Sequence, residues 1–367
     1  MSNLKNLIAQ FCPHGVEFKF VGEVVNISKG VQFNKTNMKS TGSFPVINGG
    51  INPSGYIEKY NQDENTITIS QGGASAGYVN WIPIKFWAGA HCYIIKPSDN
   101  VIDRYIFHFL KSKEKNLQEC QYGAGIPALS KSTVENILIP VPPLPVQAEI
   151  VRILDTFTEL TAELTAELTA ELKLRKKQYE YYRDKLLTFD NVPIVKLGEI
   201  GKIKRGVRVV RSQLSEIGKY AGYQNSMKPL GYYDKFNCAA NTTFVISAGA
   251  AGEIGYSYED FWAADDCLYI ECDKNLNSRF LYYLLLCHQK FIYKNVRRAS
   301  IPRLSKEVIQ NLKIPVPPID EQKRIVAILD KFDKLCNDLR EGIPAEIAAR
   351  KKQYEYYRDK LLKFEEG

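Results

Sequence analysis

The sequence predicts an α+β protein with a tandem, pseudo-two-fold arrangement, in which two globular domains are separated by two long antiparallel helices that pair as a coiled coil. Three observations predict this class. The segment RKKQYEYYRDKLL at 175–187 returns unchanged at 350–362. Each copy ends a long run rich in Ala, Leu, Glu, Lys and Arg, which are strong helix formers. Each run follows a segment in which β-branched and aromatic stretches alternate with glycine-rich turns, as in a mixed domain.

The duplication extends well beyond the identical block. Aligning 126–187 with 301–362 gives 35 identities in 62 positions, a match that chance does not produce. The same shift of 175 residues relates FWAGAHCYII at 86–95 to FWAADDCLYI at 261–270. Each half of the chain therefore combines one well-matched part with one divergent part.

The globular domains are expected at 1–143 and 190–318. Each closes at the proline-rich segment IPVPP, where proline disfavours helix in the residue before it and ends the domain. Within both domains we expect strands and short apolar helices at corresponding positions. The clearest runs are the strands Asn65–Ser70 and Thr242–Ser247 and the helices Arg104–Leu110 and Arg279–Leu286.

The two spacer helices are expected at 144–189 and 319–367. No glycine or further proline follows Pro145 in the first run, so as one helix the 45 residues from Pro145 to Phe189 would span about 68 Å. Pro145 suits the first turn of a helix. Asp320 and Glu321 place negative charge at the beginning of the second run, where it complements the helix dipole.

A shorter repeat inside the first helix defines its apolar stripe. TAEL occurs three times at 161–172, so leucines recur every four residues and the stripe drifts by about 40° per step. Such a slanting stripe needs a second helix across it, for which the matching part of the second run is the natural partner. There, Gly342-Ile-Pro344 predicts a break, with Pro344 beginning the last helical segment. The residues expected to pack in the coiled coil are Leu160, Leu164, Leu168, Leu172, Leu335, Leu339, Ile343 and Ile347.

The composition is that of an ordinary globular protein, with 45% hydrophobic and 25% charged residues, which excludes collagen-like, disordered and disulfide-rich classes. A formal charge of +8 gives a mild bias toward acidic partners such as nucleic acid. Eight cysteines without C-x-x-C spacing and four histidines form no zinc pattern, so we expect reduced, mostly buried thiols. Neither a signal peptide nor an apolar run of about 18 residues is present, and we expect a cytoplasmic location.

Sequence motifs of catalysis are missing. There is no G-x-x-x-x-G-K-[ST] segment and no Asn/Asp-Pro-Pro-aromatic segment of an adenine methyltransferase. The glycine loops at 71–77 and 248–255 match no nucleotide fingerprint and favour tight turns, with approach to a phosphate backbone as the alternative. His91 and His108 lie in apolar runs and are expected in the core. We therefore predict no catalytic residue and no metal site.

The tandem layout, the segment IPVPPIDEQKRIVAILDKFD, the repeated RKKQYEYYRDKLL helix end and the TAEL repeats resemble the specificity subunit of type I restriction–modification systems. The resemblance covers essentially the whole chain, and it departs from the pattern where Pro145 and Val146 replace the acidic pair of the second copy. It implies a non-catalytic subunit whose two target recognition domains each read one half of a bipartite, asymmetric site in double-stranded DNA.

The same resemblance implies a set of partners. The helices would set the gap between the half-sites and dock two methyltransferase (modification) subunits, and restriction (translocase and endonuclease) subunits would join through that complex. S-adenosylmethionine, ATP and magnesium would be bound by those partners, and this chain would need no cofactor of its own.

Basic clusters and polar residues near turns are the candidates for DNA contact. Lysine and arginine neutralise phosphates, whereas arginine and polar side chains at base edges specify sequence. The densest cluster lies at 202–211, where a solvated, charged strand face is the alternative. The candidates are Lys29, Lys35, Lys39, Gln71, Ser75, Asn80, Lys202, Lys204, Arg205, Arg208, Arg211, Lys294, Arg297, Arg298 and Arg303.

The unchanged block RKKQYEYYRDKLL predicts a duplicated surface for two identical partners, although a recent duplication would leave the same trace. Tyr179, Tyr182 and Leu186 have the spacing of one buried helix face, so packing within the coil is their alternative role. The exposed contact candidates are Arg175, Lys176, Lys177, Tyr181, Arg183 and Lys185, with Arg350, Lys351, Lys352, Tyr356, Arg358 and Lys360 in the second copy.

Two other functions stay open at this point. A self-contained DNA methyltransferase is opposed by the missing motifs, and binding of S-adenosylmethionine by the isolated chain would revive it. A coiled-coil adaptor without a DNA role would assemble with its partners while the full complex bound no DNA. A silent recombination copy of the gene would also have this sequence.

Overall fold

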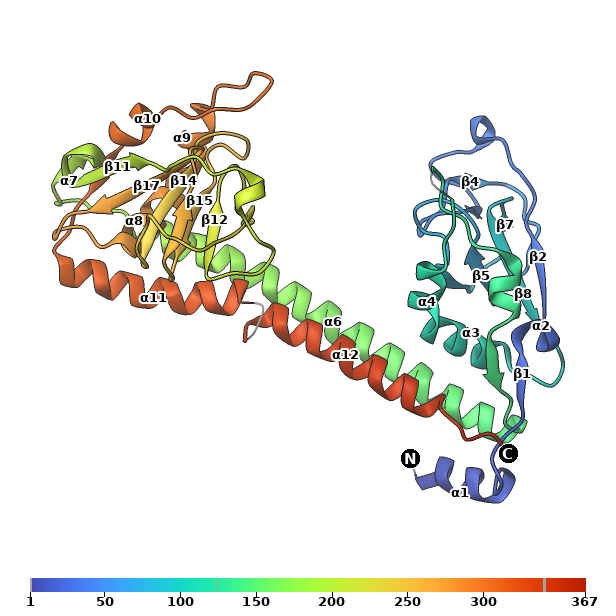
Figure 1. Ribbon diagram of the computed structural model, residues 1–367. Helices are drawn as coiled ribbons and strands as arrows, with labels where there is room; N and C mark the ends of the chain where they lie inside the picture. Colours follow the sequence, from blue (N-terminus) through green and yellow to red (C-terminus); the bar gives the residue numbers. More distant parts are fainter. Residues whose placement is uncertain (1, 124, 339–340) are drawn as a thin grey trace. The chain divides into compact units, whose positions relative to one another are not determined.

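Two compact units divide the part of the chain that the computed structural model describes, residues 2–123, 125–338 and 341–367 (Figure 1). Unit 1 comprises Met1–Glu167 and Ile347–Gly367, and unit 2 comprises Leu168–Glu346. Each unit thus contains one globular domain and part of each spacer helix. The helices do not form a separate unit.

The globular part of unit 1 contains short helices and three small sheets. Its four-stranded antiparallel sheet has the order β2-β8-β5-β6, its mixed three-stranded sheet the order β4-β3-β7, and β1 pairs with β9. The elements are α1 (Ser2–Phe11), β1 (Phe18–Phe20), α2 (Val21–Val24), β2 (Val25–Lys29), η1 (Lys35–Asn37), β3 (Phe44–Ile47), β4 (Tyr56–Ile57), β5 (Thr66–Ser70), β6 (Val79–Ile82), β7 (Trp87–Ala88), β8 (Cys92–Pro97), α3 (Asp103–Ser112), α4 (Glu114–Glu119), α5 (Lys131–Glu135) and β9 (Leu138–Pro140).

Unit 2 repeats this topology. Its sheets have the orders β11-β17-β14-β15 and β13-β12-β16, and β10 pairs with β18. The duplication is therefore visible in structure even where the two sequences have diverged. The elements are β10 (Ile194–Lys196), α7 (Leu197–Ile200), β11 (Gly201–Arg205), η2 (Arg211–Gln213), β12 (Tyr220–Tyr223), β13 (Gly231–Tyr233), β14 (Thr242–Ile246), β15 (Ile254–Ser257), β16 (Phe261–Ala263), β17 (Cys267–Cys272), α8 (Ser278–Cys287), α9 (Gln289–Lys294), α10 (Lys306–Gln310) and β18 (Lys313–Pro315).

In each of the two four-stranded sheets, an equivalent asparagine immediately precedes a central strand. Asn65 and Asn241 adopt φ values of 58° and 61°, in the left-handed region where asparagine is more common than other non-glycine residues. β5 and β14 follow immediately, and most of their side chains are buried. The strands expected near 65–70 and 242–247 are therefore confirmed, with the first residue of the former serving as a turn.

Three long helices complete the fold. α6 (Leu144–Leu186) is one continuous helix of 43 residues, with Pro145 in its first turn as predicted. α11 (Ile319–Asn337) carries the predicted acidic residues in its first turn, and α12 (Ile343–Leu361) follows it. The predicted break is confirmed, because Gly342 lies between these two helices. A Cβ on Gly342 would come within 2.7 Å of the backbone oxygens of Lys334 and Asp338, so this close approach requires glycine.

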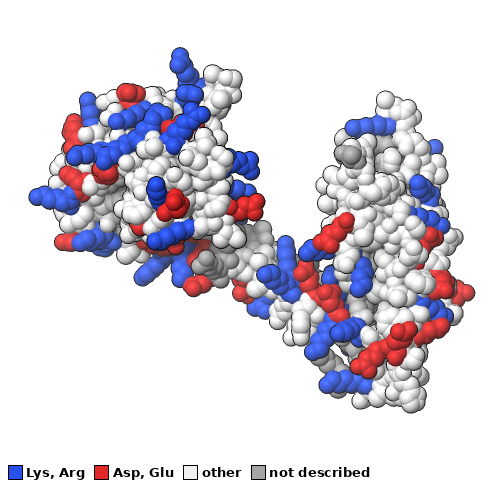
Figure 2. All heavy atoms as spheres, viewed as in Figure 1, with Lys and Arg blue, Asp and Glu red and all other residues white. Residues whose placement is uncertain are grey.

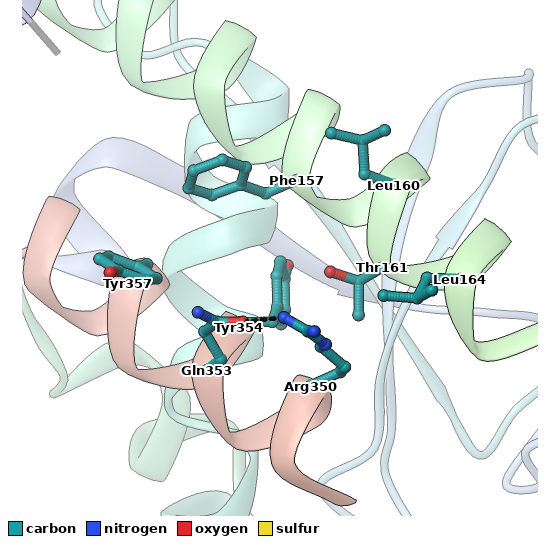
Figure 3. A pocket seen from close by; sticks show the side chains of 8 residues that line it. All are labelled: Phe157, Leu160, Thr161, Leu164, Arg350, Gln353, Tyr354 and Tyr357. Atoms are coloured by element: carbon teal, nitrogen blue, oxygen red, sulfur yellow. Dashed lines mark hydrogen bonds between the residues drawn. The ribbon is translucent and has the colours of Figure 1, made fainter. Parts of the chain in front are cut away.

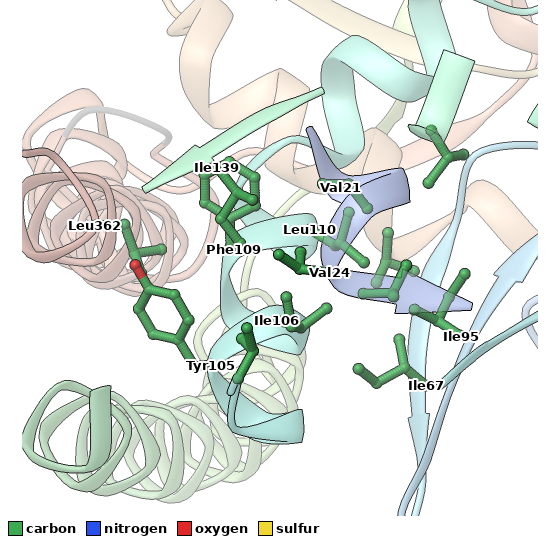
Figure 4. Close-up of a cluster of buried hydrophobic side chains, with 14 of the residues drawn as sticks. Val21, Val24, Ile67, Ile95, Tyr105, Ile106, Phe109, Leu110, Ile139 and Leu362 are labelled. Carbon is green, nitrogen blue, oxygen red and sulfur yellow. The ribbon is translucent and has the colours of Figure 1, made fainter. Parts of the chain in front are cut away.

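Helices from distant parts of the chain share the core of unit 1 (Figure 4). Leu362, just after α12, lies in the same buried cluster as Ile106 of α3 and Ile139 of β9. The C-terminal residues also pair with the N-terminal segment, since the Gly367 N–H donates to the Val16 carbonyl at 3.2 Å. The two ends of the chain thus meet within unit 1.

The core of unit 2 is built in the same way. Tyr179 and Leu187, from the repeated block at the end of α6, are buried with Ile325 and Leu329 of α11. α8 lies between α11 and the four-stranded sheet (Figure 1). Each copy of the repeated block therefore packs on a globular domain.

Two other sequence predictions can be compared with the fold. The cysteines are free, and five of the eight are buried, as expected. Burial raises the pKa of the Cys92 thiol to about 12, which makes it an unreactive thiol. No helix in the described residues combines the length and apolar character needed to cross a membrane.

Candidate nucleic-acid interface and helix surfaces

Every one of the twelve lysine and arginine residues proposed for DNA contact in the globular domains is exposed. Lys and Arg side chains gather on the side of unit 2 that carries β11 and α9 (Figure 2). Exposure leaves these groups available to phosphates, but it is also what a solvated charged surface would show.

The basic run at 202–211 does not form one continuous strand. β11 turns Gly201 and Ile203 inward and Lys202 and Lys204 outward. The strand ends at Arg205, and the next residue, Gly206, approaches the backbone of β16 so closely that a Cβ would lie 2.3 Å from the Ala263 carbonyl oxygen. The run therefore divides into a strand end and a following loop.

Two residues of this run already use some of their hydrogen-bond donors within the protein. The Lys204 ammonium lies 2.7 Å from a carboxylate oxygen of Glu271, and this hydrogen bond raises the pKa of Lys204. The Arg205 guanidinium donates to the Asp265 carbonyl at 3.0 Å. Arg208 and Arg211 follow in the loop and are exposed. The loop therefore suits phosphate contact better than the outward face of β11 does.

A surface of loops lies at the end of the sheet where β11 stops and β17 begins. We call it the loop face of unit 2 and define it by residues 247–249, 265–266 and 297–303. Hydrogen bonds connect its parts, because the Ser247 N–H donates to the Asp266 carbonyl at 2.7 Å and the Leu304 N–H donates to the Ser247 carbonyl at 2.8 Å. This arrangement brings Arg205 to the same edge as the 297–303 loop, which carries three of the predicted arginines.

The loop face of unit 1 is formed by residues 71–73, 91 and 122–128, of which Ala124 lies outside the described residues. Gln71 belongs to it, and its side-chain oxygen lies 3.4 Å from the His91 Nδ1. His91 was expected in the core, and this prediction is wrong, because it occupies the exposed turn between β7 and β8. Ser75 lies in the turn after β5, and Asn80 lies in β6 opposite Thr68.

The first globular domain carries fewer cations than the second. Lys29 ends β2 and lies over the Tyr93 ring, Lys35 begins η1, and Lys39 lies 3.9 Å from Glu58. The glycine loop at 71–77 forms the tight turn that the sequence favoured. Its Gly77 has φ +87°, and a Cβ there would come within 2.8 Å of the Gln118 nitrogen.

The repeated block presents the same surface twice. Tyr181 and Tyr356 are each 61% exposed, and in each copy a lysine, Lys185 or Lys360, lies 5.9 Å from the ring centre. The neighbouring Lys176, Lys177, Lys351 and Lys352 are exposed as well. Arg175 is half-buried and pairs with Glu171 at 3.3 Å, whereas Arg350 is exposed.

Besides the half-buried Arg175, two residues of this set differ from the prediction. Arg183 and Arg358 were expected to be exposed, but their side chains are 17% and 11% exposed. Each folds back over a tyrosine of its own helix and pairs with the next residue, Asp184 or Asp359. Both arginines lie where the helix packs on a globular domain, and this packing reduces their exposure. In unit 2 the same contact buries Tyr179.

The helices of each unit run antiparallel where they touch. In unit 1 the Phe157 and Tyr357 rings lie 6.0 Å apart, and the Thr158 and Tyr354 hydroxyls lie 3.0 Å apart. In unit 2 the Tyr182 ring stacks on Phe332 at 5.7 Å. Aromatic residues thus contribute contacts that the leucine pattern alone did not reveal.

The predicted leucine stripe is only partly covered. Leu164, Leu168, Leu172 and Ile347 are half-buried and Ile343 is buried, whereas Leu160 and Leu335 are exposed. Leu339 lies outside the described residues. In unit 1 a cavity of about 340 Å³ opens between α6 and α12, with Leu160, Leu164 and Tyr354 on its walls (Figure 3). The helix pair of unit 1 therefore keeps an open apolar surface.

Partly exposed ion pairs connect each globular domain to its helix. In unit 1 Arg104 of α3 pairs with Asp155 of α6, and the His108 Nε2 lies 2.7 Å from the same carboxylate. His108 is fully buried, as the sequence predicted. Burial lowers the pKa of His108 despite the hydrogen bond to Asp155. Burial raises the pKa of Asp155, but hydrogen bonds from Arg104 and His108 outweigh it, so that this pKa is lowered overall.

Unit 2 has the same junction with different residues. Arg279 of α8 is buried and donates to Asp330 and Asp333 of α11 at 2.8 and 3.0 Å. Tyr283 stands where unit 1 has His108, and its hydroxyl donates to Asp330 at 2.5 Å. The sequence placed these arginines on short helices but gave no sign that they are fixed to the spacer helices.

Comparisons with known proteins agree with this architecture. A family model described as the type I restriction modification DNA specificity domain matches the chain twice, at residues 13–174 and 190–349. A Haemophilus influenzae protein assigned as a type I restriction enzyme specificity subunit is 33% identical over 95% of this chain and 96% of its own. A type I restriction enzyme specificity subunit of Escherichia coli is 30% identical over 77% of each chain.

Solved structures share the fold. The S subunit of a type I restriction–modification system from M. genitalium has a TM-score of 0.59 at 22% identity, with 95% of this chain and 96% of that chain covered. A chain from a structure on complex assembly and conformational transition of the type I R-M system has a TM-score of 0.67 at 18% identity, with 96% and 98% covered. Two DNA specificity domains in tandem define the class of protein. The chain belongs to the family of type I restriction–modification specificity subunits.

Proposed function

We propose that this chain is the non-catalytic, DNA-reading subunit of a type I restriction–modification complex, and that each unit reads one half of a bipartite, asymmetric DNA site. The observation that supports this most is that the two units share one topology but carry different residues at matching positions. On the loop faces, His91 and Tyr122 of unit 1 correspond to Asp266 and Arg297 of unit 2. Side chains at base edges read sequence, so two such faces suit two different half-sites.

In this proposal the helices connect the two readers and recruit partners. α6 is continuous from unit 1 into unit 2, so the number of its residues would determine the gap between the half-sites. The repeated surfaces around Tyr181 and Tyr356 would each dock one methyltransferase subunit in the cytoplasm, and restriction subunits would join through that complex. The partners would supply the chemistry, with S-adenosylmethionine, ATP and magnesium bound to them.

The salt dependence of DNA binding tests the electrostatic part of the proposal. The complex of this chain with its methyltransferase should bind duplex DNA with an affinity that falls steeply as salt rises, since phosphate contacts release counterions. Replacing Arg208 or Arg298 by glutamine should weaken binding and reduce the slope of log affinity against log salt by about 1 for each lost phosphate contact. Fluorescence anisotropy over a salt series measures both.

Lys274 provides the matched control. It is exposed in unit 2 but follows Cys272, at the opposite end of β17 from the loop face. Lys274→Gln should leave the slope unchanged. An affinity that hardly responds to salt in the unaltered complex would contradict phosphate contact as the basis of binding.

A further inference from the structure

The 297–303 loop of unit 2 exposes an isoleucine at its tip. Ile301 is 54% exposed, and Ile126, at the equivalent position of unit 1, is 77% exposed. A single exposed apolar residue is ordinary on a protein surface. In both units the isoleucine begins the well-matched segment of the duplication, whereas the residues before it mostly differ, reading Arg-Arg-Ala-Ser in one loop and Tyr-Gly-Ala-Gly in the other.

The loop that carries Ile301 is fixed at its base. Arg297 and Arg303 exchange two backbone hydrogen bonds of 2.8 and 3.0 Å. The Gly249 N–H donates to the Pro302 carbonyl at 3.1 Å, directly after the isoleucine. This bond ties the tip to the turn after β14.

Unit 1 reproduces these constraints. Tyr122 and Ala128 exchange two backbone hydrogen bonds of 2.9 Å, and the Gly73 N–H donates to the Pro127 carbonyl at 2.8 Å. The two loops therefore share an Ile-Pro tip that is fixed by backbone hydrogen bonds. Proline restricts the backbone of the residue before it, and a β-branched side chain has few rotamers, so the isoleucine is held in a narrow range of orientations.

The chemistry of this tip differs from that of its surroundings. An isoleucine side chain cannot donate to or accept from a base edge or a phosphate. Three arginines of the same loop, Arg297, Arg298 and Arg303, are exposed beside it. An apolar tip flanked by cations is the composition that proteins use to unstack a base step while holding the phosphates on either side.

We propose that Ile301 is a wedge that enters between two stacked base pairs of bound DNA and bends the duplex. The proposal rests on the proposed function, since it requires that the loop faces meet DNA. It adds a contribution to specificity that does not depend on base edges, because steps that unstack easily, such as TA and CA, accept a wedge at lower cost.

The test uses the complex of this chain with its methyltransferase and a duplex that carries both half-sites, as read from the methylation pattern of the host. Fluorophores at the two ends of the duplex report bending, and 2-aminopurine at successive positions reports unstacking. For Ile301→Ala we expect loss of the bend and of the 2-aminopurine signal in one half-site, with affinity about tenfold weaker, which corresponds to about 1.4 kcal/mol.

Ile217 is the matched control, because it is an isoleucine of the same unit with 89% exposure, outside the loop face. Ile217→Ala should leave bending, unstacking and affinity unchanged. An unchanged bend and an unchanged 2-aminopurine signal for Ile301→Ala would overturn the proposal. So would weaker binding that uracil in place of thymine reproduces, because that result identifies a contact with a thymine methyl group. Failure of the unaltered complex to bind any duplex would instead refute the proposed function.

Discussion

At the scale of single residues, one arginine in each unit pairs with the spacer helix that packs on its globular domain. Arg279 is buried among four tyrosine rings, with ring centres 4.6 to 5.2 Å from its guanidinium carbon, and it meets two aspartates of α11. A charge removed from water in this way is stable only with its partners in place. The attachment is therefore sensitive to the loss of any one member.

Replacing Arg279 by methionine should destabilise unit 2 by about 3 kcal/mol, because Asp330 and Asp333 lose the cation that compensates their partial burial. Urea unfolding of the complete chain measures the change. Arg324→Met is the control, since Arg324 forms an exposed pair with Glu321 on the outer side of α11 and should cost less than about 1 kcal/mol. Equal effects of the two substitutions would contradict the assigned role of Arg279.

His108 gives unit 1 a pH dependence that unit 2 does not share at this position. Its pKa is lowered by burial, so the folded state holds the neutral ring while the unfolded chain takes up a proton below about pH 6.5. The associated stability is complete above that pH and is lost as the pH falls toward the lower, folded pKa. The loss should be at most about 1.4 kcal/mol between pH 6.5 and 5.5.

His108→Tyr copies the residue that unit 2 uses and should remove this part of the pH dependence. Thermal unfolding of the full chain at pH 7.5 and 5.5 provides the measurement, with the exposed His91→Tyr as the control. If the difference between the two pH values is the same in His108→Tyr as in the unaltered chain, His108 is not its source.

At the scale of helices and strands, composition and periodicity were sufficient for the main elements. A run free of glycine predicted α6, and Gly342 with Pro344 predicted where the second spacer helix breaks. The position of His91 was not predictable in this way, because the sequence pattern does not distinguish a histidine inside a strand from one in the turn before it. The burial of Arg183 also escaped, since it depends on a globular domain beside the helix.

The length of α6 carries a prediction of its own. Adding or removing one TAEL unit changes a helix by about 6 Å, comparable to one or two base-pair rises of 3.4 Å. The unspecified gap of the DNA site should change accordingly, while both half-sites stay the same. Replacing one TAEL unit by AAEL, which keeps the length, is the control and should leave the gap as it was. Altered half-sites would count against the helix as the determinant of spacing.

At the scale of the whole molecule, the contacts show an organisation that the linear sequence conceals. In unit 2 the repeated block ends at Leu187, and the chain then continues into the strand β10. In unit 1 the same block ends near the C-terminus, where the last residues pair with Val16, and the strand β1 that follows Val16 takes the place of β10. The two units are therefore the same assembly with the chain interrupted in only one. Self-similarity of the sequence predicted the duplication, but not that each copy of the block completes a globular domain.

The loop faces are the part of the candidate site that sequence reasoning did not find. The sequence identified the arginines as candidates. It did not predict that 297–303 lies against the end of β14, because this contact depends on hydrogen bonds between segments far apart in the chain. A comparison of the two halves could have suggested the loops, because Ile-Pro is the first shared pair after ten aligned positions with one identity. Which bases each face prefers follows from side-chain geometry against DNA, for which no simple residue code exists.

The central claim is that two units read two half-sites, and mapping methylated adenines across the genome of a host that carries this chain and its methyltransferase tests it most directly. The map should reveal one motif made of two specified parts separated by a gap of fixed length. Exchanging residues 192–318 for another recognition domain should then change one part of the motif and leave the other part intact. A single continuous motif, or an exchange that alters both parts, would contradict the account.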